Sequence, residues 1–202
     1  MDLKKAQGES LSASQGKPEG EAEDLYIPDG TWLITFNYLV KNEPAAVTLL
    51  QAMSCLDPHC IQFSLFYLKD KIDLYPDFKP LFGERLLCLG MCEADLLEAF
   101  DCLAKFCLIT RSPDGKYYQI QQPVRERTLK HVRSDKTGGS FTNSVLLVSL
   151  SCLELSLDKA DLFTCLLPHI LELTSFRHEL CLEISKCLLL EIRLHAIRFL
   201  RL

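Results

Sequence analysis

Ten cysteines and five histidines are the residues of this 202-residue chain whose spacing can be tested against known metal and redox sites. No two cysteines have the C-x-x-C spacing of zinc ribbons and thioredoxin-like proteins. Cys88 and Cys92 are four residues apart, as are Cys55 and His59, so on helices these groups could share faces and bind zinc. Most of the cysteines, however, lie among Leu, Phe and Ile, where a free thiol packs as a small apolar group. The spacing therefore favours buried thiols over a metal site.

No other pattern indicates catalysis or a cofactor. Gly16 and Lys17 are followed by Pro18 and lack the earlier glycine of a phosphate-binding loop. Neither the Gly-x-Ser-x-Gly turn of serine hydrolases nor the His-Glu-x-x-His pair of zinc proteases occurs. We therefore expect no enzymatic activity, no catalytic residue, no metal, no cofactor and no small-molecule substrate.

The sequence shows no sign of export or membrane insertion. The first ten residues are mostly polar or charged, and no apolar core of a signal peptide follows them. The longest uncharged stretch, Thr137 to Leu153, opens with glycines and polar residues. It leaves about nine apolar residues, whereas a bilayer span needs about 20. We expect a cytoplasmic protein that contacts no membrane and keeps its thiols reduced.

Apolar spacing and turn residues place the elements that must position any functional side chain. Residues 1–24 hold three lysines and six acidic residues, so we expect a disordered acidic tail. Strands are predicted over 106–111 and 116–121, joined by a turn with Pro113, Asp114 and Gly115. Asn42 is the expected cap of the first helix, and residues 70–90 are expected to be less regular. Helices are predicted over 44–56, 60–69, 93–107, 123–133, 145–156, 158–175 and 177–202.

This order of elements predicts a mainly α fold. Three helices followed by a β-hairpin wing over residues 25–136 are typical of a winged-helix domain. A linker is expected at 137–144, followed by a helical segment at 145–202 that would form a bundle or lead into repeats.

Charge is unevenly distributed along the chain, whose net charge of −5 argues against a globally basic nucleic-acid binder. The outer face of the third helix would carry four acidic residues and Lys105, which disfavours contact with phosphates. From Arg111 to Lys136 there are seven basic and three acidic residues. The simplest reading of this basic segment is a solvated face. The functional reading is a surface that binds a partner, and its residues would be Arg125, Arg127, Lys130 and Arg133.

Several motifs, taken in order, give a more specific hypothesis. They are TWLITFN at 31–37, NEPAA at 42–46, LL at 49–50, MSCLD at 53–57, FCLITR at 106–111 and LLPH at 166–169. In this order they resemble the winged-helix region of fungal NOD-like STAND proteins, in which an NB-ARC ATPase core is followed by tetratricopeptide repeats.

The resemblance implies a regulatory module, with no enzymatic activity, that relays a state to neighbouring domains and binds a protein partner or a second copy. In the family, a histidine after the second wing strand senses the bound nucleotide, and Gln121 stands at that position here. Only a short acidic segment precedes Thr31 where the family carries its ATPase core, so we expect no nucleotide to bind. The strongly apolar segment 177–202 would favour self-association if no repeat covers it. The alternative function is a winged-helix nucleic-acid-binding protein that uses its basic wing.

Overall fold

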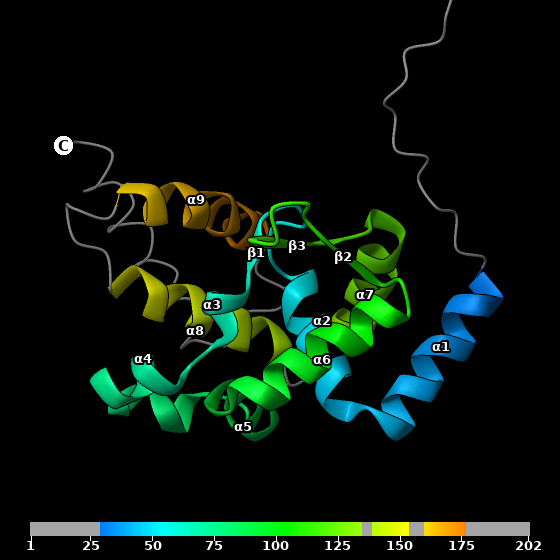
Figure 1. Cartoon of the computed structure of the whole chain (residues 1–202), viewed down its shortest axis with the longest axis horizontal. Helices are drawn as coiled ribbons and strands as arrows, with labels where there is room; N and C mark the ends of the chain where they lie inside the picture. Colours follow the sequence, from blue (N-terminus) through cyan, green and yellow to red (C-terminus); the bar gives the residue numbers. More distant parts are fainter. Residues whose placement is uncertain (1–28, 135–138, 154–159, 177–202) are drawn as a thin grey trace, which may run out of the picture.

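The computed structural model describes residues 29–134, 139–153 and 160–176 (Figure 1). The predicted tail at 1–24 and the predicted helix at 177–202 lie outside these residues. The described chain is mainly α-helical with one small antiparallel sheet, which confirms the predicted fold class at this level. In chain order the elements are α1 (Asp29–Asn42), α2 (Pro44–Ser54), β1 (Ile61–Gln62), α3 (Phe63–Phe66), α4 (Lys69–Leu74), the 3-10 helix η1 (Pro76–Leu81), α5 (Glu84–Met91), α6 (Glu93–Lys105), β2 (Ile109–Arg111), β3 (Tyr117–Ile120), α7 (Gln122–Ser134), α8 (Gly139–Leu153) and α9 (Ala160–Ser175).

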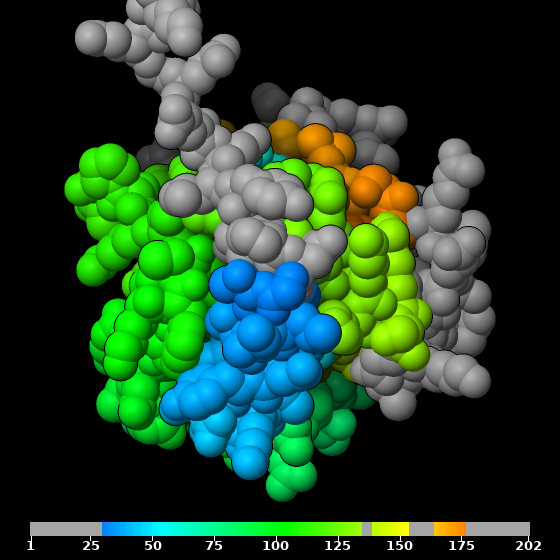
Figure 2. All heavy atoms as spheres, turned by 90° about the vertical axis from the view of Figure 1, so that its right-hand side faces the viewer, coloured from blue at the N-terminus to red at the C-terminus, as the bar shows by residue number. Residues whose placement is uncertain are grey.

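The first two helices meet at Pro44, which occupies the first turn of α2. The prediction that Asn42 caps α2 is wrong. Asn42 is the last residue of α1, and its side-chain amide donates to the carbonyl of Tyr38, while Glu43 takes the cap position of α2. Trp32, Phe36 and Leu39 bury one face of α1. The opposite face leaves Leu33, Ile34 and Tyr38 exposed. Figure 2 shows α1 (blue) in the middle of the side of the molecule that faces the viewer.

The predicted helix at 60–69 is wrong in outline. It is divided into β1, α3 and the start of α4 because the N–H of Leu68 donates to the carbonyl of Gly90 at 2.7 Å and leaves the helical pattern. Residues 70–90, expected to be less regular, form α4, η1 and α5. Gly83 begins α5, and its N–H donates to the side-chain oxygen of Asn143 on α8.

The amphipathic helix α6 and the hairpin after it confirm the predictions for this region, although the strands are shorter than expected. Cys107 ends α6 with a φ of 55°, and the N–H groups of Cys107 and Leu108 donate to the carbonyls of Ala104 and Leu103. This is the hydrogen-bond pattern of a Schellman motif. Gly115 supplies the positive φ of 71° in the hairpin turn. The strand β1, which the sequence did not reveal, pairs with β3 and gives the sheet order β1-β3-β2.

The expected linker at 137–144 is wrong from Gly139 onward, because α8 begins there. Polar residues at its start do not interrupt the helix, because their side chains find partners: the Ser144 hydroxyl shares its hydrogen between the carbonyls of Ser140 and Ala52, each 2.9 Å away. Every residue from Phe141 to Cys152 is buried, and α8 contacts α2, α3 and α9. No described helix combines the length and the hydropathy needed to cross a membrane.

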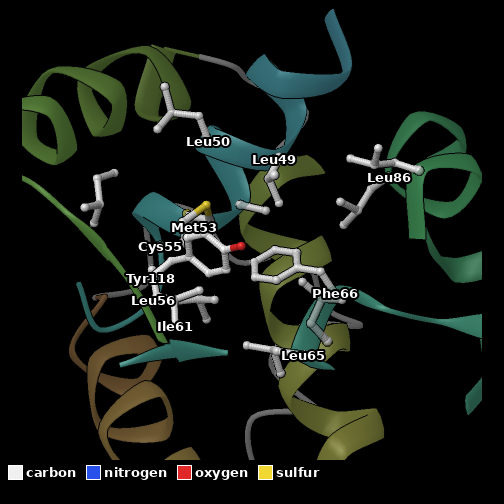
Figure 3. Packing of buried hydrophobic residues seen from close by; sticks show 14 of the residues in the cluster. Leu49, Leu50, Met53, Cys55, Leu56, Ile61, Leu65, Phe66, Leu86 and Tyr118 are labelled. Carbon is white, nitrogen blue, oxygen red and sulfur yellow. The ribbon is translucent and has the colours of Figure 1, made fainter. Parts of the chain in front are cut away.

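The hydrophobic core includes residues of α1 to α7 and of the later helices α8 and α9. Leu49, Leu50 and Met53 of α2 lie at its centre together with Phe66 and Tyr118 (Figure 3). The same cluster of buried residues includes Val145 to Val148 of α8 and Leu166, Ile170 and Leu173 of α9. Residues 29–134 and the helices α8 and α9 therefore share one hydrophobic core.

Candidate functional site on helices α7 and α9

The four basic residues predicted as a contact surface on α7 have different surroundings. Lys130 and Arg133 are exposed, Arg127 is half-buried, and Arg125 is only 9% exposed. The prediction of a contact surface is therefore wrong for Arg125, because its side chain points into the fold. Lys130 and Arg133 remain available to a partner.

Arg125 connects three helices. Its Nε donates to the carbonyl of Ser54 at the end of α2 at 3.0 Å, and one terminal nitrogen forms an ion pair with the carboxylate of Glu172 on α9. A planar guanidinium can make both contacts at once, which the single ammonium group of lysine cannot do with the same geometry. Helix α7, which follows the hairpin directly, is thereby fixed to α9.

His169 makes a second polar connection, between α9 and the backbone of residues 57–60 just after α2. Its Nδ1 accepts a hydrogen bond from the N–H of Asp57 at 3.1 Å, so Nε2 carries the proton and donates to the carbonyl of Cys60 at 3.2 Å. The ring is 1% exposed. Burial lowers the pKa of His169, and the nearby Asp57 carboxylate and the Cys60 carbonyl only partly oppose that shift. The geometry therefore favours a neutral histidine in one tautomer.

Together, Arg125, His169 and Glu172 form what we call the α9 clamp. His169 and Glu172 are one helical turn apart on α9, and Arg125 and His169 both bond the backbone of residues 54–60. The LLPH motif includes His169, but nothing in the sequence links this histidine to the backbone groups of Asp57 and Cys60, more than 100 residues away.

Gln121 lies between β3 and α7 and is half-buried. Its side-chain oxygen is buried and has no hydrogen-bond partner among the described residues. Its backbone carbonyl accepts the N–H of Arg125 at 2.9 Å and so belongs to the first turn of α7. The role of Gln121 as a nucleotide sensor stays a prediction.

Of the eight cysteines that the structure describes, two are buried, four are half-buried and two are exposed. Cys55 and Cys152 are buried, and burial raises the pKa of each thiol to about 12, which keeps both thiols protonated. Cys88 and Cys107 are exposed, contrary to the prediction of buried thiols. The part of the chain that the structure describes contains no group of three or more Cys, His, Asp or Glu side chains arranged to hold a metal ion. Cys55 is buried and His59 is exposed, so the pair considered for zinc does not share a face.

The outer face of α6 is acidic, as predicted. Glu93, Asp95, Glu98 and Asp101 are all exposed, and Lys105 is the exposed cation at the end of the helix. The hairpin carries Arg111, whose Nε donates to the carbonyl of Gly115 and whose guanidinium lies 5.9 Å from the centre of the Tyr118 ring.

Comparison with protein-family models, with curated proteins and with solved structures gives no match.

Proposed function

We propose that this chain is a non-enzymatic interaction module built on a winged-helix unit, similar in organisation to the middle region of NOD-like STAND proteins. The order helix, strand, helices and hairpin supports this architecture, as does a sheet in which the first strand pairs with the second strand of the hairpin. In this reading α6 is the third helix and the β2–β3 hairpin is the wing.

The observation that carries the proposal is the α9 clamp. Helix α7 follows the wing directly, and Arg125 on α7 bonds both α2 and α9. A contact made by the exposed side chains Lys130 and Arg133 is therefore mechanically connected to α9 through one helix. This connection suits a module that relays the binding of an acidic protein surface to the helices that follow.

A nucleic-acid-binding function fits the charge distribution less well. Helix α6 would face the major groove in a winged-helix protein, and its exposed acidic residues would meet phosphates. Arg125 is not available to the wing surface, which leaves Arg111, Lys116, Lys130 and Arg133 as the exposed cations among the described residues of the predicted basic segment. The proposed partner is accordingly a protein or a second copy of the chain.

The test is self-association of the full chain, measured by sedimentation velocity over a range of concentrations. The double variant Lys130→Glu/Arg133→Glu should weaken the association roughly tenfold, because charge reversal turns attraction into repulsion at a contact. The control Lys69→Glu/Lys79→Glu makes the same change in net charge at exposed positions of α4 and η1 and should have little effect.

Three results would contradict the proposal. Equal loss in both double variants would show that only net charge matters. Tight binding of ATP or ADP to the chain would indicate a nucleotide-dependent activity. If the chain is monomeric at all concentrations, the same variants are compared for retention of a partner from cell extract. Retention that is equal in the wild type, the α7 variant and the control would also reject the α7 surface.

A further inference from the structure

A groove of about 580 Å³ lies between three helices on a surface that the proposed function does not use. The helices α2, α5 and α6 contact one another, and Figure 1 shows α5 and α6 side by side with α2 next to them. The first turn of α2 forms one wall, α5 forms the second and the first half of α6 forms the third. The lining residues are Glu43, Pro44, Ala45, Ala46, Glu84, Arg85, Cys88, Leu89, Asp95, Glu98 and Ala99.

The floor and the rim of this groove differ in chemistry. Ala46, Leu89 and Ala99 are buried and form an aliphatic floor. The charged lining residues are all exposed and form the rim: the acids Glu43, Glu84, Asp95 and Glu98, and the base Arg85. Four carboxylates and one guanidinium give the rim a net charge of −3. Within the described ranges none of these five side chains makes a hydrogen bond or an ion pair, so their charges are not neutralised by the fold.

Helix stability accounts for only part of this acidity. Glu84 and Asp95 lie in the first turns of α5 and α6, where a negative charge stabilises a helix. Glu98 lies beyond the first turn of α6, and the Glu43 side chain makes no capping hydrogen bond to α2. Both carboxylates act on the Cys102 thiol: burial raises its pKa most, Glu43 raises it further, Lys105 lowers it and Glu98 raises it. Glu43 and Glu98 thus act on the same thiol from two different walls of the groove.

We propose that this groove binds a basic amphipathic segment of another protein, with small apolar side chains on the aliphatic floor and Lys or Arg side chains against the rim. An apolar centre with a polar, solvated rim is the usual anatomy of a protein interface. A site for a small molecule usually has buried polar groups that converge on the ligand. The buried residues of this floor, in contrast, are Ala and Leu. The charge is opposite to that of the exposed α7 residues, so the two surfaces would take different partners.

The experiment uses the full chain and a synthetic helical peptide of about 15 residues with Ala and Leu on one face and Lys and Arg on both flanks. Binding is measured by fluorescence anisotropy of the labelled peptide. Glu43→Lys/Glu98→Lys should weaken binding roughly tenfold, whereas Glu93→Lys/Asp101→Lys should change it less than about twofold. Glu93 and Asp101 are exposed acids of α6 outside the groove, so this control makes the same change in net charge.

Two further measurements separate shape from charge. Ala45→Trp adds a bulky side chain to the lining and should also weaken binding roughly tenfold, whereas Leu97→Trp, on an exposed position of α6 outside the groove, should not. The peptide should slow alkylation of Cys88, which lines the groove, and leave the exposed Cys107 unaffected.

Several outcomes would overturn the inference. Equal losses in the two charge-reversal pairs would mean non-specific attraction. Protection of Cys88 by a linear tetraamine but not by the peptide would indicate a small cation. Absence of peptide binding at low salt would leave the groove without the proposed partner. None of these outcomes bears on Lys130 and Arg133, so the proposed function of α7 stands or fails separately.

Discussion

Within the α9 clamp, His169 bonds the backbone of Asp57 and Cys60, and its protonation state decides whether it can make both bonds. His169 accepts the N–H of Asp57 through Nδ1, and a protonated ring would lose that acceptor. Because burial lowers the pKa of His169 below its usual 6.5, its contribution to stability is full above about pH 6.5 and is lost as the pH falls. We predict that the free energy of unfolding, measured with urea, decreases between about pH 7 and pH 5.

The histidine variants separate this effect from other titrations. His169→Gln should flatten that part of the pH profile, since glutamine does not titrate there. His59→Gln is the matched control, because His59 is exposed, and it should keep the wild-type slope. A His169→Gln profile parallel to the wild type would show that His169 is not the titrating group.

Arg125 and Lys130 test the difference between a structural and a surface cation on one helix. Arg125→Ala removes the bonds to Ser54 and Glu172 and leaves a buried carbonyl and a partly buried carboxylate without their partner. We expect a loss of about 2–4 kcal/mol in the free energy of unfolding. Lys130→Ala should change it by less than about 0.5 kcal/mol. Similar values for the two variants in urea unfolding would contradict the clamp.

These two residues also show what could be read from the sequence. Arg125 lies on the same stripe of α7 as Leu129 and Val132, at spacings of four and seven, so its burial had a signal in the helical period. A count of charges along the segment does not show that Arg125 is buried. The role of His169 had no such signal, because its partners, Asp57 and Cys60, are brought to it only by the tertiary fold.

At the scale of elements, the close contact between α5 and the α3–α4 junction depends on a residue without a side chain. A Cβ on Gly90 would lie 2.7 Å from the carbonyl oxygen of Phe66 and 2.7 Å from Cγ of Leu68. We therefore predict that Gly90→Ala lowers the free energy of unfolding by about 1–3 kcal/mol. The control is Gly30→Ala in α1, where nothing lies within 4 Å, and it should be neutral or stabilising by up to about 1 kcal/mol. Thermal unfolding that ranks the two variants in the reverse order would refute this packing.

Elements with a strong local signal could be predicted, and those formed by tertiary contacts could not. The apolar stripe of α6 and the Pro-Asp-Gly turn define their structures within a few residues. The two residues of β1 become a strand only because Ile61 and Gln62 pair with β3. The start of α8 resembles a linker in composition, but its hydroxyls bond helical carbonyls and its position between α2 and α9 buries it.

At the scale of the whole molecule, the shared core implies that α8 and α9 unfold together with the β2–β3 hairpin and the helices before it. Trp32 on α1 and Cys152 on α8 are both buried, and they report on the first described helix and on a helix after the hairpin. If one core joins them, Trp32 fluorescence and the alkylation of Cys152 should show the same urea midpoint, as expected for a two-state domain. Cys55 at the end of α2 should become reactive with them, because its thiol is also fully buried.

The exposed thiols give this measurement an internal standard. Cys88 and Cys107 should react before unfolding begins, so their alkylation checks that the reagent is active at every urea concentration. Mass spectrometry of the alkylated peptides then gives one curve for each cysteine. If Cys152 reacted at a clearly lower urea concentration than that at which Trp32 fluorescence changes, α8 would leave the fold first. A single cooperative core would then be contradicted, because α8 would unfold separately from α1.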